Sequence, residues 1–395
     1  MHEDLIGAFT VSALPPAADA ERLRDRLGVP NEDPGPEKTI VEGVNWLCLA
    51  QDRSATHDGG VARHFSLFSG WGVSYPETTG YIIPTLLEVA RLRRDKTLRQ
   101  RAKRMLDWLV SIQYPDGAFQ GGHVLDKPKV PVTFNTGQIL IGLAHGVREF
   151  GKKYRPAMVR AADWLVATQD PGGAWRKHPS PFAMAGDRAY DTHVAWGLLE
   201  AAQTERDERY ANAATTNVRW ALAHQAPNGW FSRCCLTDPK QPLTHTIGYT
   251  LRGVLEVYRY SKDPALLIAC RKTADGLLTA LLPDGFLPGR LNRDWRGTVG
   301  WACLTGTSQI VLCWLILYQL TGNVAYRDAA FAANCYVRRT VRVVGQLETR
   351  GAVKGSFPVS GDYAPYEFVN WACKFSVDAN LMELAVRRHE KQNAR

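Results

Sequence analysis

Long apolar runs, a basic N-terminal leader and dense basic clusters are all missing from this 395-residue sequence. No stretch approaches the roughly 18 uninterrupted apolar residues that a membrane helix needs. The N-terminal segment has no Lys or Arg before its short apolar run and carries acidic residues there instead, which is atypical of a signal peptide. We therefore expect a cytoplasmic protein without a membrane span.

Metal-binding patterns are missing as well. The eight cysteines form no CxxC pair and show no zinc-ribbon spacing, and no Cys–His pair stands adjacent in the sequence. In a long chain without an export signal, such cysteines are typically reduced and buried. We expect no bound metal and no cofactor.

The charge balance favours an anionic partner. The formal net charge is +9, but there is no run of five or more basic residues. Neither a helix-turn-helix nor an RNA-binding signature occurs, so nucleic acid is disfavoured as a partner. We expect an acidic glycan instead, and the oligomeric state stays open.

One amphipathic helical stretch occurs six times along the chain. Each copy opens with small polar residues, and the copies align at intervals of 57, 56, 54, 61 and 65 residues. Regular repeats of this length are typical of stacked or closed helical arrays. The aligned residues are Thr79, Thr136, Thr192, Thr246, Thr307 and Ala372.

A second set of helical stretches alternates with the first. Its clearest copies share a Trp, then a Gln, then a turn, then Gly and an aromatic residue. The turns read Pro-Asp-Gly, Pro-Gly-Gly and Pro-Asn-Gly, which supply the backbone angles that end a helix abruptly. Three copies are clear, two are looser and one is weak: 105–119, 161–175 and 218–231; 45–60 and 276–290; and 335–363.

These two sets together predict six helical hairpins. The second set carries the charge and the first is apolar nearly all round, as expected of outer and inner helices. A closed ring leaves no exposed ends, and no polar capping repeat is evident. We predict an all-α (α/α)6 toroid over residues 40–390, preceded by an N-terminal extension over 1–39.

The turns QYPDGAF, TQDPGGAW and HQAPNGWF resemble the Gln–Trp repeats of the prenyltransferase and squalene cyclase superfamily. The whole pattern is similar to six-hairpin toroid enzymes, which include polysaccharide lyases, unsaturated glucuronyl hydrolases and sugar epimerases. SGWGVSYPETTGYIIPTL, CLTGTSQI and NWACKFSVDANL also resemble toroid proteins of bacterial exopolysaccharide and capsule loci. The resemblance implies a role in the biosynthesis or processing of a polysaccharide. The DxDD and DDxxD motifs of terpenoid cyclases are absent, which makes an isoprenoid enzyme the weaker alternative.

The inner helices of such a toroid run parallel, so their N-termini gather at one mouth. Their free N–H groups and positive dipole ends favour an anionic ligand there. The candidate catalytic residues in these first turns are His193, His245, Tyr249, Glu77, Asp191 and Asn135. The candidate substrate-binding residues, from the same turns and the loops before them, are Trp71, Tyr75, Gln138, Arg290, Arg293, Trp295, Trp301, Glu367, Asn370 and Lys374.

Each candidate also has a structural interpretation. The aligned threonines suit helix capping better than substrate contact. His193 and His245 are not favoured caps, and a core role stays as open as a functional one. Tyr249 lies four residues after His245, hence on the same helical face, and core packing and catalysis are equally open interpretations of it.

These residue types point to a carbohydrate-active enzyme, and three reactions fit them. β-Elimination needs a Tyr or His base and a group such as Asn or Arg beside the uronate carboxylate. Hydrolysis needs two carboxylates, for which Glu77 and Asp191 are the candidate pair. C5 epimerisation needs proton transfer on both faces of the sugar. A non-catalytic glycan-binding protein of a polysaccharide assembly complex is the alternative of a different class.

Overall fold

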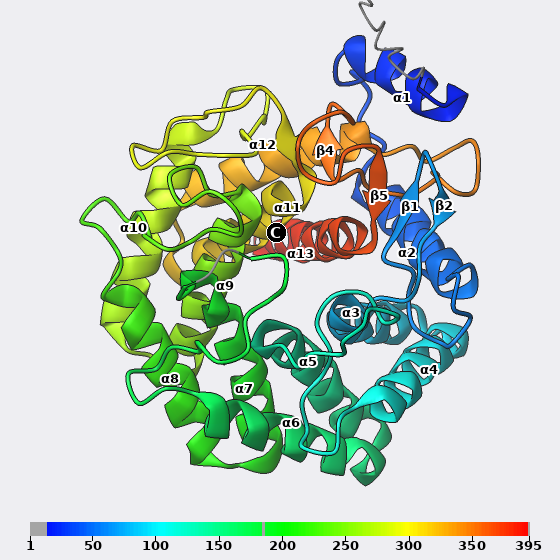
Figure 1. Ribbon diagram of the computed structural model, residues 1–395. Coiled ribbons are helices and arrows are strands. Elements are labelled where there is room, and N and C mark those ends of the chain that lie inside the picture. The colour runs from blue at the N-terminus through cyan, green and yellow to red at the C-terminus, as the bar shows by residue number, and fades with distance from the viewer. Residues whose placement is uncertain (1–13, 184–185, 394–395) are drawn as a thin grey trace, which may run out of the picture.

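The computed structural model describes residues 14–183 and 186–393. Six inner helices surround a central axis, and six outer helices surround them (Figure 1). The inner helices are α3 (Pro76–Arg93), α5 (Thr133–Phe150), α7 (Thr192–Glu205), α9 (Thr244–Ser261), α11 (Leu304–Thr321) and α13 (Asn370–Asn393). The outer helices are α2 (Pro36–Asp52), α4 (Lys96–Ile112), α6 (Arg155–Thr168), α8 (Glu208–Leu222), α10 (Pro264–Ala280) and α12 (Val324–Thr340). The predicted (α/α)6 toroid is confirmed.

The ring closes between its first and last helices. Helix α13 packs against both α2 and α3, so the last inner helix is paired with the first outer helix. The short strand β1 (His64–Ser66) supports this closure, because it pairs with both β2 (Gly70–Trp71) and β5 (Glu367–Val369). A second small sheet joins β3 (Ala302–Cys303) to β4 (Ser356–Phe357). Both sheets lie in the loops that lead into inner helices.

The Gln that recurs in the outer repeats joins neighbouring hairpins by two hydrogen bonds, which we call the Gln staple. Gln113 Nε2 donates to the carbonyl oxygens of Gly117 at 3.0 Å and Ala157 at 2.8 Å. The same pair of bonds, 56 residues on each time, is made by Gln169 to Gly173 and Ala213, and by Gln225 to Gly229 and Ala269. Each Gln therefore fixes its own turn and joins it to the next outer helix.

The threonines that define the inner repeat do not cap their helices. Thr79 Oγ1 donates to the carbonyl of Tyr75 and accepts the N–H of Val61. Thr136 makes the same pair of contacts with Val132 and Phe119. These hydroxyls lie inside the first turn and hold the incoming loop, which explains their repetition without any contact to substrate.

Helix α11 is long and apolar enough to cross a membrane by composition, and 78% of it is buried inside the ring. It is therefore an inner helix of the toroid. The helix α1 (Pro16–Arg26) lies outside the ring, beside the loop that carries β4 (Figure 1). All eight cysteines are free thiols.

Candidate functional site

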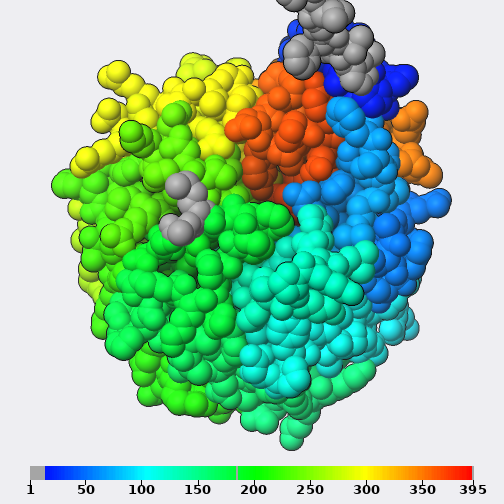
Figure 2. All heavy atoms as spheres, in the orientation of Figure 1, coloured from blue at the N-terminus to red at the C-terminus, as the bar shows by residue number. Residues whose placement is uncertain are grey.

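A cavity of about 370 Å³ opens at the N-terminal end of the inner helices. We call it the mouth cavity. Loops that precede the inner helices surround it, and they meet on the face of the molecule seen in Figure 2. Its walls include ten aromatic or histidine rings and two arginines. The lining residues used below are Arg63, Tyr75, Glu77, Tyr81, His123, Phe134, Tyr190, His245, Tyr249, Arg290, Asp362, Tyr363 and Trp371.

Glu77 is the buried carboxyl group of this cavity. It occupies the first turn of α3, directly after Pro76 starts the helix. Burial raises its pKa to about 7, although a hydrogen bond with Tyr75 and the charge of Arg63 both act to lower it. The carboxyl group is therefore protonated at mildly acidic pH and can donate a proton.

His245 is a neutral imidazole with a defined tautomer. Its Nδ1 lies 2.7 Å from Oε1 of Gln309, which only accepts hydrogen bonds. Nδ1 therefore carries the hydrogen, and Nε2 is left as the acceptor on a ring that lines the cavity. Burial lowers the pKa of His245 to about 4, so the ring is a base at neutral pH.

His193 forms a second, deeper pair of the same kind. Its Nδ1 lies 2.6 Å from Oε1 of Gln138, and its side chain is almost fully buried. The His193 ring, on α7, contacts the Tyr249 ring, on α9, with 4.4 Å between the ring centroids. It does not line the mouth cavity, and Tyr249 lies between it and His245.

Tyrosines close the inner end of the cavity. The hydroxyl groups of Tyr81 and Tyr249 lie 3.3 Å apart across the axis, and Phe375 packs against both rings. Burial raises the pKa of both tyrosines well above the ordinary value, so both phenols are neutral. We call these three residues the aromatic plug.

Two arginines give the cavity a cationic wall. Arg63 donates to Glu367 at 2.9 Å and lies over the Trp371 ring at 5.1 Å. Arg290 bonds to the Gln241 carbonyl at 3.0 Å and to Asp362 at 3.2 Å. A guanidinium fork of this kind matches a carboxylate or phosphate group.

Buried polar atoms without a partner gather around the starts of the inner helices. Buried polar groups are normally hydrogen-bonded, so an exception that lines a cavity is available to a polar ligand. Within the described residues, the atoms without a partner here are Thr78 Oγ1, Thr133 Oγ1, Asn135 Nδ2, Gln138 Nε2, Tyr190 Oη, His193 Nε2, Thr305 Oγ1, Gln309 Nε2 and Asn370 Oδ1. Of these residues, Thr78 and Tyr190 line the mouth cavity, so their hydroxyl groups are the ones placed to bond a sugar there.

Several other predicted residues lie away from the mouth cavity. Asp191 is buried beside Arg188, and burial raises its pKa to about 7. Asn135 is buried in the first turn of α5. Trp71 packs against Trp46, because it belongs to the small sheet that closes the ring.

The arginine- and tryptophan-rich loop contributes only part of its side chains to the mouth cavity. Arg290 lines it, whereas Arg293 is exposed outside it. Trp295 packs against Trp230 on the outer ring, and Trp301 packs beside Gly289.

The predicted residues at the C-terminal end of the chain also separate. Glu367 pairs with Arg63, and Asn370 donates to the carbonyl of Ala62, so both support the wall rather than line the cavity. Lys374 was expected at the mouth but faces the other end of the axis, where it pairs with Asp378. Lys374 lies about one turn after Asn370, and its ammonium group is directed to Asp378, one further turn along α13.

The sequence reasoning did not identify Arg63, Tyr81, His123, Tyr190 or Trp371, which all line the cavity. Tyr190 immediately precedes the candidate Asp191 in the sequence. Tyr81 lies four residues after Glu77, which places the two side chains on one face of the helix. No group of three or more metal-binding side chains occurs among residues 14–183 and 186–393.

Comparisons with known proteins support the fold. Residues 77–255 match the family model of the squalene-hopene cyclase C-terminal domain, which is less than half of the chain. A solved unsaturated glucuronyl hydrolase specific for heparin has a TM-score of 0.71 at 16% identity, covering 89% of this chain and 98% of that chain. The unsaturated glucuronyl hydrolase from Bacillus sp. GL1 has a TM-score of 0.67 at 14% identity, covering 88% and 96%.

A D-mannose isomerase is similar as well, with a TM-score of 0.71 at 11% identity over 89% of this chain and 97% of that chain. No curated protein sequence matches the chain. These likenesses confirm the predicted (α/α)6 toroid fold. At such identities the likeness establishes the fold, and the reaction has to be argued from the side chains.

Proposed function

We propose that this protein is an enzyme that cleaves a uronate-containing saccharide by β-elimination. The observation that supports it is the pairing of two titratable groups in one cavity. Burial raises the pKa of Glu77 to about 7 and lowers that of His245 to about 4. Between these values the cavity offers a proton donor and a proton acceptor at once, which is the arrangement that acid–base chemistry needs.

The proposed reaction assigns one step to each group. His245 Nε2 accepts the proton from C5 of the uronate, and an arginine of the wall, Arg63 or Arg290, neutralises the carboxylate. Glu77 donates its proton to the oxygen that leaves C4. The C5–H and C4–O bonds break and a C4=C5 double bond forms, so protons and electrons balance.

The same cavity disfavours the isoprenoid alternative. Aromatic rings suit a carbocation, but Arg63 and Arg290 place two positive charges in the wall. A carboxylic acid with a pKa of about 7 is also a weak acid, ill-suited to protonating an alkene. We therefore favour the saccharide.

Hydrolysis is the second candidate reaction. Glu77 supplies a protonated carboxyl group, and the side chain of Asp362, 73% exposed, supplies a second carboxylate in the same wall. Asp191, the partner expected from the sequence, lies outside this wall. A general acid and a general base of this kind are what a glycosidase needs.

The test is to incubate the protein with uronate-containing polymers and oligosaccharides. β-Elimination gives a growing ultraviolet absorbance from the unsaturated product, and the rate should rise with pH through about 4 and fall through about 7 as His245 and Glu77 titrate. His245→Ala and Glu77→Gln should each lower kcat by about 100-fold or more. Arg293→Gln, at an exposed position outside the cavity, is the matched control.

The remaining outcomes separate the alternatives. New reducing ends without the absorbance would identify a hydrolase, and solvent deuterium entering the sugar without cleavage would identify an epimerase. Binding of the saccharide with no turnover would leave a glycan-binding protein. An active enzyme with unchanged rates in both cavity variants would overturn the assignment of Glu77 and His245.

A further inference from the structure

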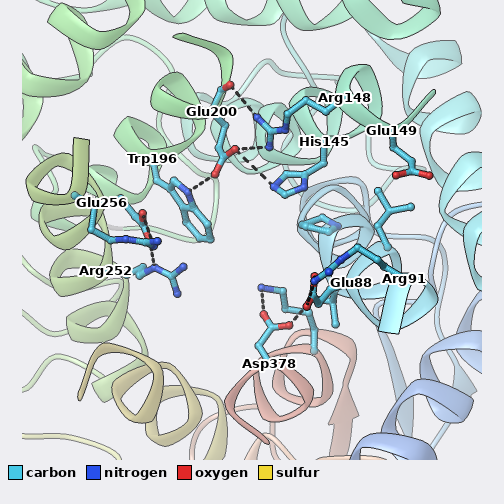
Figure 3. A pocket seen from close by; sticks show the side chains of 15 residues that line it. Glu88, Arg91, His145, Arg148, Glu149, Trp196, Glu200, Arg252, Glu256 and Asp378 are labelled. Carbon is cyan, nitrogen blue, oxygen red and sulfur yellow. Dashed lines mark hydrogen bonds and ion pairs between the residues drawn. The ribbon is translucent and has the colours of Figure 1, made fainter. Parts of the chain in front are cut away.

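A second cavity, of about 430 Å³, lies at the other end of the toroid axis. We call it the C-terminal cavity, because its lining from α3, α5 and α9 comes mostly from the second halves of these helices. Side chains from α3, α5, α7, α9 and α13 converge on it (Figure 3). The aromatic plug of Tyr81, Tyr249 and Phe375 lies between this cavity and the mouth, and no residue lines both.

The carboxylates of the C-terminal cavity already accept bonds from basic neighbours. Glu200 accepts from Arg148 and Trp196, and Asp378 accepts from Lys374 and Thr85. The same holds for the remaining three: Glu88 pairs with Arg91, Glu149 with Arg99, and Glu256 with Arg252 and Arg259. Little acceptor capacity is left for a cationic ligand.

Among the buried basic side chains of this cavity, donor capacity remains on Arg252 and Lys374. Arg252 uses only Nε, which donates to Glu256 at 2.6 Å, and its two terminal nitrogens have no hydrogen-bond partner within the described residues. Its guanidinium lies over the Trp196 ring at 4.2 Å, and its side chain is only 14% exposed. Lys374 makes one ion pair, with Asp378 at 2.7 Å, and is 3% exposed.

These two cations lie near each other in a desolvated setting. Arg252 contributes to lowering the pKa of Lys374, after burial as the larger cause. Burying like charges together is costly unless an opposite charge compensates them. Arg252 and Lys374 each pair with one carboxylate on their own helix. Arg252 shares its carboxylate, Glu256, with Arg259, so the cluster of these three residues keeps an excess positive charge.

We propose that the C-terminal cavity is a binding site for a small molecule that carries a carboxylate or phosphate group. The Arg252 fork takes two oxygens of the anion, and Lys374 contributes a further donor. The cavity volume suits a ligand about the size of a monosaccharide. This site is independent of the reaction proposed for the mouth.

The test is isothermal titration of the full chain with glucuronate, glucose 6-phosphate and inorganic phosphate, with glucose as the uncharged comparison. We expect saturable binding of at least one anion and much weaker binding of glucose. Preference for glucuronate identifies a carboxylate site, and preference for either phosphate probe identifies a phosphate site. Absence of saturable binding by all three anions overturns the proposal.

Variants locate the bound anion. Arg252→Gln should weaken binding about ten-fold or more, because a charge-assisted bidentate contact is lost. Arg252→Lys keeps the charge and removes the fork, so it serves as the second variant if the first fails to fold, and it should also weaken binding. Arg290→Gln alters only the mouth cavity, so it should leave the affinity of the C-terminal cavity unchanged, as should the exposed Arg293→Gln. Unchanged affinity in Arg252→Lys, or loss of binding in Arg290→Gln, contradicts the C-terminal location.

Discussion

At the scale of single residues, Glu77 shows how the fold sets a protonation state. A carboxyl group placed at a buried helix start, with only partial compensation from Tyr75 and Arg63, holds its proton more tightly than in the unfolded chain. Linkage then requires the folded protein to lose stability when this proton is removed. The burial that makes Glu77 a proton donor also lowers the stability of the folded protein at alkaline pH.

We expect Glu77→Gln to stabilise the protein at pH 8 and to have little effect at pH 4. The pKa is raised from 4.5 to about 7, so the stability linked to this proton is fully present below 4.5 and is lost as the pH rises through 7. The gain at pH 8 should be about 3 kcal/mol in the free energy of unfolding, by the ordinary conversion of a pKa shift. Urea denaturation of both proteins at the two pH values measures it.

The control for this experiment is Glu32→Gln, at an exposed position. It should shift stability by less than about 0.5 kcal/mol at either pH. Equal stability of Glu77→Gln and the unaltered protein at pH 8 would show that Glu77 is ionised without cost, and it would remove Glu77 as the proton donor.

The two histidines show why a site read from the sequence is incomplete. Both stand in the first turn of an inner helix, but His193 follows its aligned threonine whereas His245 precedes the next one. An offset of two positions turns a helical side chain by roughly 200°. One ring therefore lines the mouth cavity and the other packs behind Tyr249. The offset can be read from the sequence. Which of the two directions faces the cavity depends on the packing of the neighbouring helices, which the sequence does not give.

At the scale of elements, the outer repeat is explained by hydrogen bonds rather than by chemistry on a substrate. The side chain of Gln113 satisfies two backbone carbonyls, one in its own turn and one on the next outer helix. Gly117 completes the turn with φ of +103°, and a Cβ at this position would lie 2.2 Å from the carbonyl oxygen of Arg160. Close packing of the turn on the next helix therefore requires glycine here.

We expect Gln113→Ala to lower the free energy of unfolding by about 1–3 kcal/mol, since two carbonyl groups lose their partner. Gln203→Ala is the matched control, because Gln203 is exposed on α7. Chemical denaturation compares the two variants with the unaltered protein. A Gln113→Ala variant as stable as the Gln203→Ala control would show that water replaces the two hydrogen bonds of Gln113. The recurrence of Gln in the outer repeats would then need another explanation.

The hairpins themselves could be predicted because each repeat carries its own helix and turn signals. The outer helices also begin at residues that cap well, such as Asp95 and Asp207, whose side chains accept first-turn N–H groups. The small sheets could not be predicted, since strands of two or three residues leave almost no pattern.

At the scale of the whole molecule, helix α1 is joined to one wall of the mouth. Lys354 lies between the two, with its ammonium group 2.6 Å from Glu21 Oε1 and 2.5 Å from Asp25 Oδ1. Asp25 also accepts the N–H of Val359, which belongs to the loop that continues to Tyr363 in the mouth cavity. The segment outside the ring therefore fixes a loop of the proposed site.

We expect Lys354→Met to destabilise the protein by about 3–5 kcal/mol, because it leaves Asp25 buried without its cation and leaves Glu21 with only Arg24 and Arg342. The loop from Val359 to Tyr363 should loosen with it, so KM for the saccharide should rise more than kcat falls. Lys240→Met, at an exposed position, is the control for removing a lysine. Thermal denaturation and steady-state kinetics of the two variants test this coupling. A Lys354→Met protein that loses stability but keeps an unchanged KM would show that α1 stabilises the toroid without positioning the mouth.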